Sequence, residues 1–246
     1  METTGAASKV DLSVVIPVFN EEGNLAPLLE ELEPVLASLG RTFEVVCVDD
    51  KSTDGSVDAL RRLAKDRAYL RIVRHGVNCG ESAAQASGFR HARGGIIITM
   101  DADLQNDPAD IPRLLEGLAG DTAAVCGVRA KREDSLVRRI SSRIANSFRN
   151  AVTGDRISDA GCTFRAIRSE ALGELPVFNG LHRFLSTILR FQGFKVKEIQ
   201  VNHRPRTRGA SKYGVGNRMW RGIRDCLAMR WYRARAVRAD RTKRDE

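Results

Sequence analysis

The sequence predicts an α/β fold built on a doubly wound, mostly parallel sheet. From about residue 13, apolar runs rich in β-branched residues alternate with stretches of helical periodicity. The predicted strands end in polar loops, as at 49–55 and 101–107. Parallel strands need crossover connections, so this alternation favours right-handed β-α-β units. In such a sheet, ligands bind outside the carboxyl ends of the strands.

The first half of the chain is expected to hold four strands separated by three helices. Asn24 is the expected cap of the first helix and Gly40 its end. No Gly-x-Gly-x-x-Gly turn follows the first strand and no P-loop is present, which disfavours those nucleotide-binding folds. The predicted strands are 13–19, 43–48, 70–73 and 96–100, and the predicted helices are 24–39, 56–68 and 81–92.

The second half is expected to add three strands and further helices. One of these helices follows a charged loop at 129–134. Its apolar face would carry Leu136, Ile140, Ile144 and Phe148, with Arg138, Arg139, Arg143 and Arg149 directed elsewhere. The remaining predicted elements are strands at 123–128, 162–167 and 195–201 and helices at 109–118 and 182–191.

The basic charge of the chain is concentrated near its C-terminal end. Of the 40 Lys+Arg and 31 Asp+Glu, 14 and 4 lie in 203–246, and the first 202 residues are nearly neutral. This distribution indicates an anionic partner for the C-terminal part: phosphate, nucleic acid or a lipid surface. No apolar run approaches the roughly 20 residues of a bilayer span. Residues 1–9 lack the apolar core of a signal peptide, so we expect a cytosolic protein with five reduced cysteines.

Composition divides the chain into five expected parts. A disordered lead-in at 1–10 precedes one large α/β domain at 11–202, and the tail at 238–246 is again expected to be disordered. The glycine-rich basic stretch 203–216 is either a flexible lid over an anionic ligand or a solvated surface loop. Residues 217–237 mix aromatic residues with arginines, which is typical of amphipathic helices at a membrane interface. A helix packed on the core and a nucleic-acid contact are the alternatives.

The strand at 96–100 ends in the strongest candidate site. Asp101 and Asp103 follow it at spacing i, i+2. Hard carboxylate ligands without His or Cys suit Mg²⁺ or Mn²⁺, ions that commonly bridge a protein to substrate phosphates. The competing interpretation is an inert, solvated turn.

Six ordered motifs resemble the inverting glycosyltransferases of family two, which have the GT-A fold. The first three are IPVFNE at 16–21, VDDKSTDG at 48–55 and DADLQNDP at 101–108. The later three, SRIAN at 142–146, DAGCTFR at 159–165 and RTRGASKY at 206–213, are similar to the dolichol-phosphate mannosyltransferase branch. That branch includes bacterial enzymes that glycosylate polyprenyl phosphate, and the similarity covers roughly 12–220.

The resemblance implies a role for each matching residue. The catalytic positions are Asp103, Arg206 and Lys212, and the metal ligands for Mg²⁺ or Mn²⁺ are Asp101, Asp103 and Gln105. The donor-binding positions are Pro17, Phe19, Glu21, Val48, Asp50, Asp101, Ala102, Asp103, Arg129, Arg206 and Lys212. The acceptor phosphate would be held by Arg138 and Ser142. Relatives often carry Tyr at the Phe19 position, so a hydroxyl contact is absent here.

The implied reaction moves a hexose from a donor of the GDP-mannose or UDP-glucose type to polyprenyl or dolichyl phosphate. The enzyme would act at the cytoplasmic face of a membrane, as a peripheral protein held by its own helices or by an anchoring partner protein. The first alternative is a transferase of the same fold with a saccharide or protein acceptor. The remote alternative is a basic nucleic-acid binder, which the neutral first 202 residues argue against.

Overall fold

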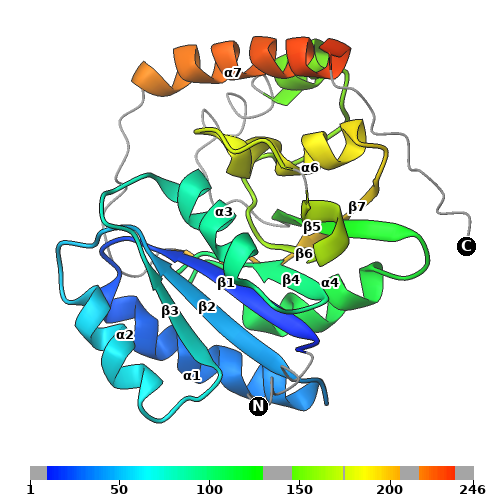
Figure 1. Ribbon diagram of the computed structural model, residues 1–246. Helices are drawn as coiled ribbons and strands as arrows, with labels where there is room; N and C mark the ends of the chain where they lie inside the picture. Colours follow the sequence, from blue (N-terminus) through cyan, green and yellow to red (C-terminus); the bar gives the residue numbers. More distant parts are fainter. Residues whose placement is uncertain (1–9, 130–145, 174, 206–215, 236–246) are drawn as a thin grey trace, which may run out of the picture.

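The structure is a computed structural model that describes residues 10–129, 146–173, 175–205 and 216–235, with side chains of the last range described from 222. A seven-stranded sheet forms its centre, in the order β3-β2-β1-β4-β6-β5-β7 (Figure 1). Only β6 runs antiparallel to its neighbours β4 and β5 within this sheet. The strands are β1 Leu12–Val18, β2 Phe43–Asp49, β3 Leu70–Arg74, β4 Ile96–Thr99, β5 Thr122–Arg129, β6 Arg165–Arg168 and β7 Lys195–Val201.

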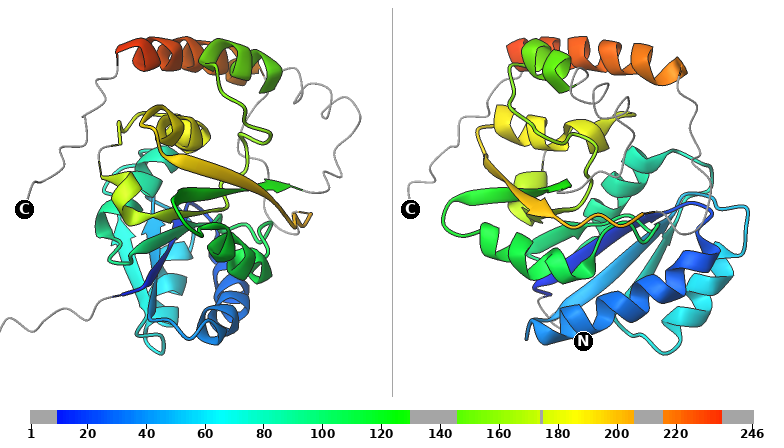
Figure 2. Two further views of the ribbon diagram at one scale, coloured as in Figure 1. Left: turned by 90° about the vertical axis from the view of Figure 1, so that its right-hand side faces the viewer. Right: turned by 180° about the vertical axis from the view of Figure 1, so that it is seen from behind.

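Helices cover both faces of the sheet. The α-helices are α1 Glu22–Ser38, α2 Ser56–Ala64, α3 Glu81–His91, α4 Ile111–Gly117, α6 Leu181–Phe191 and α7 Gly216–Arg235, and residues 146–153 are also helical. Short 3-10 turns, η1 Pro108–Asp110 and η2 Ser169–Leu172, precede α4 and follow β6. Figure 2 shows α7 beyond α6, on the side of the molecule away from α1 and α2.

The buried side chains alternate along the central strands, as a sheet covered on both faces requires. Val14 and Ile16 of β1 pack in a cluster with residues of α1, α2 and α4. Val15 of β1 points the other way, into a cluster with Val46, Ala84 and Ile97 beneath α3. The predicted fold class is therefore confirmed, and all seven expected strands are present with ends within three residues.

Two local predictions were wrong. Asn24 lies inside α1 and donates a hydrogen bond to Glu21 Oε2 at 2.6 Å, so it is not the N-cap, a position that Glu21 occupies. The expected apolar face of the helix before 155 is reversed where the structure describes it. Phe148 is 44% exposed, whereas Arg149 is buried and stacks on the ring of Phe184 at 4.9 Å. The partners offered by α6 therefore override the simple periodicity.

Where the structure describes it, the C-terminal helical segment is a single helix, α7. Cys226 and Met229 of α7 pack with apolar residues of α6, and Asp225 pairs with Arg183 at 3.1 Å. The opposite side exposes Leu227 and Trp231 beside Arg224 and Arg235. Among the described residues, no helix has both the length and the apolar character of a bilayer span.

Candidate active site

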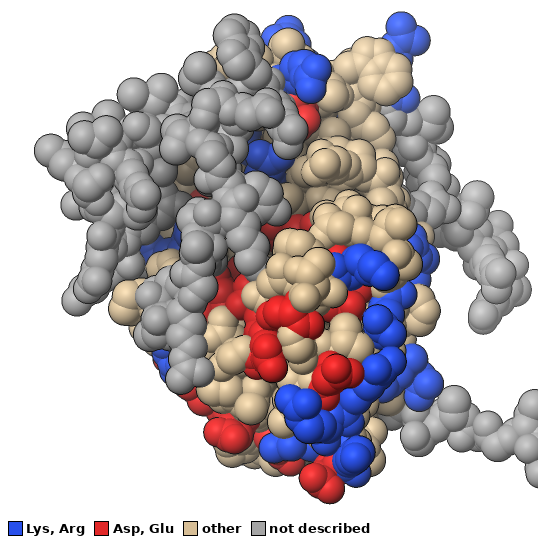
Figure 3. All heavy atoms as spheres, turned by 90° about the vertical axis from the view of Figure 1, so that its left-hand side faces the viewer, with Lys and Arg blue, Asp and Glu red and all other residues tan. Residues whose placement is uncertain are grey.

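A cleft of about 350 Å³ opens where β1, β2 and β4 end and α3 begins. Seven of the predicted donor-site residues line it: Pro17, Phe19, Glu21, Asp50, Asp101, Ala102 and Asp103. Val18, Asn78, Glu81 and Ala84 complete the lining. Figure 3 shows acidic side chains gathered near the middle of the face that carries this sheet edge. The parallel strands thus deliver residues from three distant motifs to one place, as expected for an α/β sheet.

The loop after β4 is held in an unusual conformation. Leu104, between the two acidic positions and Asp107, has a φ of 63°, in the left-handed region. Such a backbone costs about 1–3 kcal/mol for a non-glycine residue. Hydrogen bonds stabilise it: Asp101 N donates to Asn106 Oδ1 at 3.0 Å, and Gln105 N donates to Asp103 Oδ1 at 3.2 Å. The strained loop presents both carboxylates to the cleft.

Folding raises the pKa of two of the five carboxyl groups that line this cleft, which belong to Glu21, Asp50, Glu81, Asp101 and Asp103. Burial, followed by the neighbouring Asp103 charge, raises the pKa of Asp101 to about 6. Burial, followed by the Asp101 charge, raises the pKa of Glu81 to about 7. The buried Arg165 guanidinium and a 2.6 Å hydrogen bond from Thr163 Oγ1 to Asp101 Oδ2 oppose these shifts. A divalent cation bound by oxygen ligands would relieve this repulsion, so the donor set fits Mg²⁺ or Mn²⁺.

Glu81 is a cleft residue that the sequence analysis missed. It lies in the first turn of α3, and its Oε2 is 3.6 Å from His182 Nε2 of α6. An acidic residue in a first helical turn is usually explained by the helix dipole, so it gives no separate signal of a site. The packing of α3 on β1 and β2 brings Glu81 into the same cleft as Asp101.

We expect Glu81→Gln to stabilise the metal-free protein at pH 8 and not at pH 4.5. A carboxyl group with a raised pKa in the folded state disfavours folding once it ionises, so its penalty grows as the pH rises from about 4.5 to 7. The amide removes that penalty. The expected gain is about 1–2 kcal/mol, or a few degrees in Tm. Thermal unfolding in chelator at both pH values measures it, and an equal change at both would contradict it.

Three further predicted residues do not line the cleft. The side chain of Val48 is fully buried beneath α3, so it cannot itself contact a ligand. Arg129 forms a two-pronged ion pair with Asp159, at 2.7 and 2.8 Å. Gln105, expected to bind metal, directs its amide to the Arg204 carbonyl at 3.2 Å. Each of these residues is near a cleft residue in the sequence or lies at the end of a strand of the same sheet. Packing nevertheless directs its side chain to another partner.

The described start of the predicted basic loop is fixed beside the acidic loop. His203 forms a β-bridge with Asn106, and Arg204 N donates to Gln105 O at 2.9 Å. The Arg204 guanidinium pairs with Glu31 at 2.5 Å and with Asp107 at 2.9 Å. Residues about 100 positions apart in the chain therefore meet at the cleft's rim. Arg206, Lys212, Arg138 and Ser142 lie outside the described residues.

The glycosyl transferase family 2 model matches residues 13–175. Dodecaprenyl-phosphate galacturonate synthase of Rhizobium johnstonii is 35% identical over 235 residues, covering 94% of this chain and 69% of that protein. Undecaprenyl-phosphate 4-deoxy-4-formamido-L-arabinose transferase of Pseudomonas aeruginosa is 40% identical over 208 residues, covering 84% and 61%. The chain thus spans less than two thirds of the latter relative.

Solved structures resemble the fold at lower identity. Glucosyl-3-phosphoglycerate synthase of Mycobacterium tuberculosis, solved with Mn²⁺, UDP-glucose and phosphoglyceric acid, superposes with a TM-score of 0.69 at 18% identity, covering 91% of this chain and 79% of that one. A mannosyltransferase of Pyrobaculum calidifontis, solved with GDP-mannose and Mn²⁺, gives 0.60 at 24% identity, covering 92% and 64%. The family match, the relatives and the sheet architecture agree: the chain belongs to glycosyl transferase family 2 and has the GT-A fold.

Proposed function

We propose that this protein transfers a sugar from a nucleoside-diphosphate donor to polyprenyl phosphate. The observation that carries the proposal is the cleft at the sheet edge, where Asp101 and Asp103 lie with residues of the 16–21 and 48–55 motifs. The chain's relatives are named for sugar transfer to dodecaprenyl or undecaprenyl phosphate. Carboxylates that hold a divalent cation serve as its ligands rather than as nucleophiles, so the cleft suits direct displacement by the acceptor phosphate.

The reaction needs charge neutralisation more than proton transfer. An oxygen of the acceptor phosphate would bond to the anomeric carbon as the bond to the diphosphate breaks, with inversion. Asp101 and Asp103, and Gln105 by resemblance, would hold Mg²⁺ or Mn²⁺, which stabilises the departing diphosphate as a Lewis acid. Arg206 and Lys212 are proposed to add positive charge there, and Arg129 to support them. A phosphate monoester has a second pKa near 6, so it is anionic at neutral pH and needs no strong base.

Asp50 has room for one further contact with a donor. Its carboxylate already accepts hydrogen bonds from Cys79 N at 2.8 Å, Gly80 N at 2.7 Å and the His75 ring at 2.7 Å. A carboxylate offers about four lone-pair sites, which leaves roughly one for an N–H of a nucleotide base. We propose that Asp50 reads the base in this way, with the backbone of Val48 alongside.

The donor sugar is the finer part of the proposal. The relatives transfer galacturonate or a formamido-arabinose, whereas the motif resemblance favours donors of the GDP-mannose or UDP-glucose type. We propose a screen by thermal shift with Mn²⁺ and each of these nucleotide sugars. Donors that raise Tm would then be incubated with Mg²⁺ or Mn²⁺ and undecaprenyl phosphate.

A sugar-labelled product in the organic phase is the expected result. Product in the aqueous phase alone, with a saccharide or protein acceptor, would favour the same fold with another acceptor. Salt-sensitive binding to nucleic acid without any nucleotide-sugar binding would overturn the enzyme assignment. No product with any of these donors, while a donor binds, would overturn the polyprenyl acceptor.

We propose that α7 brings the enzyme to a membrane surface. Residues 224, 227, 228, 231 and 235 recur at helical spacing and form its exposed side, which joins Leu227 and Trp231 to two arginines. Apolar side chains with flanking arginines suit the boundary between headgroups and acyl chains. This would hold the cleft near its lipid acceptor at the cytoplasmic face, with or without an anchoring partner protein.

The double substitution Leu227→Glu and Trp231→Glu should weaken binding to anionic vesicles by roughly 10–100-fold, because two large apolar groups no longer enter the interface. Sedimentation with phosphatidylglycerol vesicles measures this. The matched control is Val177→Glu, which changes an exposed apolar residue outside α7, 53% exposed. Equal losses in both proteins, or none in the double variant, would contradict the role of α7.

A further inference from the structure

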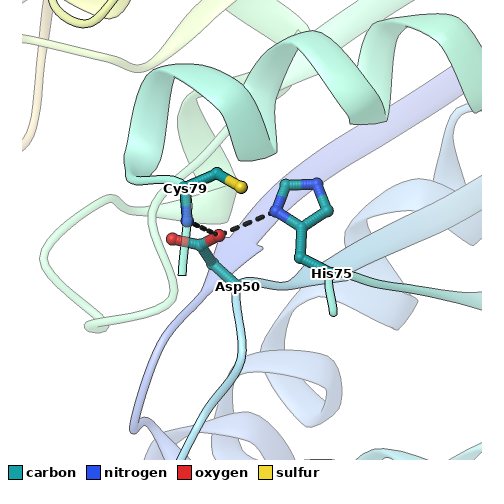
Figure 4. Close-up of side chains that lie close together, drawn as sticks. All are labelled: Asp50, His75 and Cys79. Atoms are coloured by element: carbon teal, nitrogen blue, oxygen red, sulfur yellow. Dashed lines mark hydrogen bonds and ion pairs between the residues drawn. The ribbon is translucent and has the colours of Figure 1, made fainter. Parts of the chain in front are cut away.

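A second group of metal-ligating side chains lies beside the cleft. Asp50 follows β2, His75 follows β3 and Cys79 stands just before α3 (Figure 4). A carboxylate oxygen, a ring nitrogen and the sulfur of these residues all lie within 4.8 Å of one another. Figure 4 shows the three side chains converging from separate elements. Three unlike ligand atoms are therefore already close enough to share one ion after a small adjustment.

We propose that Asp50, His75 and Cys79 form a binding site for a thiophilic divalent cation, typified by Zn²⁺, separate from the Asp101–Asp103 pair. Zn²⁺ takes sulfur, nitrogen and oxygen ligands in a tetrahedron, and three protein ligands leave one position for water. Thiolate and imidazole ligands select against Mg²⁺. The two sites would thus separate cations by ligand chemistry, although Asp50 also lines the cleft.

The carboxylate of this site is rigidly placed. Asp50 N donates to Val18 O of β1 at 2.8 Å, and Asn78 Nδ2 donates to Asp50 O at 2.9 Å. The side chain is buried and accepts from the backbone N–H groups of Cys79 and Gly80. The same bonds fix the chain that carries the thiol, so the carboxylate and the sulfur are positioned together.

The histidine has the outer hydrogen bond that metal-binding histidines usually have. His75 Nδ1 is 2.7 Å from Asp50 Oδ1, and Nε2 is 2.8 Å from Ser87 Oγ. Arg90 in turn donates to Ser87 Oγ at 3.1 Å. When Nδ1 binds an ion, the single proton of the neutral ring lies on Nε2 and is donated to Ser87 Oγ. The short contact between Nδ1 and Asp50 then opens to admit the ion.

Cys79 gives the site its access to solvent. The residue is exposed, and its thiol donates a long 3.4 Å hydrogen bond to Val77 O. The other four cysteines are buried. On binding, the ion replaces the thiol proton, which leaves to solvent, while the single imidazole proton lies on Nε2, so affinity rises with pH.

The test is a titration of the full chain with Co²⁺, the spectroscopic stand-in for Zn²⁺, in excess Mg²⁺ to fill oxygen-only sites. We expect a thiolate-to-cobalt charge-transfer band that saturates at a single equivalent and is removed by Zn²⁺. Cys79→Ser should abolish the band. Ser87→Ala should lower the affinity by about 10–100-fold, and His75→Gln by more, because it removes a ligand rather than its support.

The controls are Cys226→Ser, a buried cysteine, and His91→Gln, a histidine at the far end of α3. Both should keep the band and the affinity of the parent chain. The absence of a band in the parent chain, or a band that survives Cys79→Ser, would overturn the site. Because the readout is absorbance without any nucleotide sugar, it is independent of the proposed transfer reaction.

Discussion

Asp103→Asn is expected to lower kcat/KM for sugar transfer by about 10³-fold. The substitution keeps the shape of the side chain but removes the charge that would hold the divalent cation beneath the donor diphosphate. It also removes a like charge beside Asp101, so it should not destabilise the fold. Transfer assays and calorimetric binding of the donor with Mn²⁺ measure the effect, and thermal unfolding verifies the fold.

Asp58→Asn is the matched control for this experiment. Asp58 lies on the exposed surface of α2 in an ion pair with Arg61 at 3.2 Å, and it has no proposed role in the cleft. It should retain full activity.

Arg138→Ala tests the other substrate: donor binding should stay near normal while the lipid-phosphate step weakens. If Asp103→Asn and Arg138→Ala both lose donor affinity alone, the acceptor role of Arg138 is wrong.

Asp155→Ala should cost the largest share of stability among the substitutions considered, about 3–5 kcal/mol or roughly 10 °C in Tm. Asp155 is buried, accepts from Thr187 Oγ1 at 2.6 Å and from Arg190 Nη1 at 2.7 Å, and lies 4.0 Å from Arg149. Burial alone would raise the pKa of Asp155, but these hydrogen bonds outweigh it and lower the pKa. Its removal leaves the buried Arg149 without the nearby carboxylate.

The pH dependence of this effect has a definite sign. A carboxyl group whose pKa is lowered by folding stabilises the folded state above its ordinary pKa, and the stabilisation disappears as the pH falls through the folded value. The difference in the free energy of unfolding between the parent and Asp155→Ala should therefore be largest at pH 7 and shrink below about pH 4.

Asp121→Ala provides the comparison for Asp155→Ala. Asp121 pairs with Lys195 at the similar distance of 2.8 Å, but both side chains are exposed. Solvent screens exposed pairs, so they contribute little to stability. Chemical denaturation of the three proteins distinguishes burial from distance as the source of the stability. Losses of equal size at the two aspartates would show that the buried network is not important.

The parts of the fold that depend on local pattern were predictable from sequence. Apolar β-branched runs identify strands because a sheet that is covered on both faces favours such side chains. Ile96–Thr99 is the clearest case. Asp101 and Asp103 were found because they interrupt such a run abruptly. The placement of Arg206, Lys212, Arg138 and Ser142 stays a prediction, as does the division of the chain at 203 and 217.

What could not be predicted depends on contacts between distant segments. Glu81 belongs to the cleft through the packing of α3, and Arg149 is buried because α6 supplies Thr187 and Phe184. The anchoring of Arg204 by Glu31 joins positions 173 residues apart. The direction of β6 also has no sequence signal, because an apolar strand has the same pattern in either direction.

The reversed course of β6 has a consequence for the acidic cleft. Because β6 is antiparallel, it begins at the edge of the sheet where β4 ends. The residues just before and at its start therefore lie beside the last residue of β4, with Thr99 opposite Arg165. This short segment thereby brings the Thr163 hydroxyl into a hydrogen bond with Asp101 and the buried Arg165 guanidinium near the carboxylates. Alternate residues of a strand face opposite sides, so a slip of β6 by one residue against β4 would turn that cation away. The register of this segment therefore influences the electrostatic potential of the cleft as much as the acidic residues do.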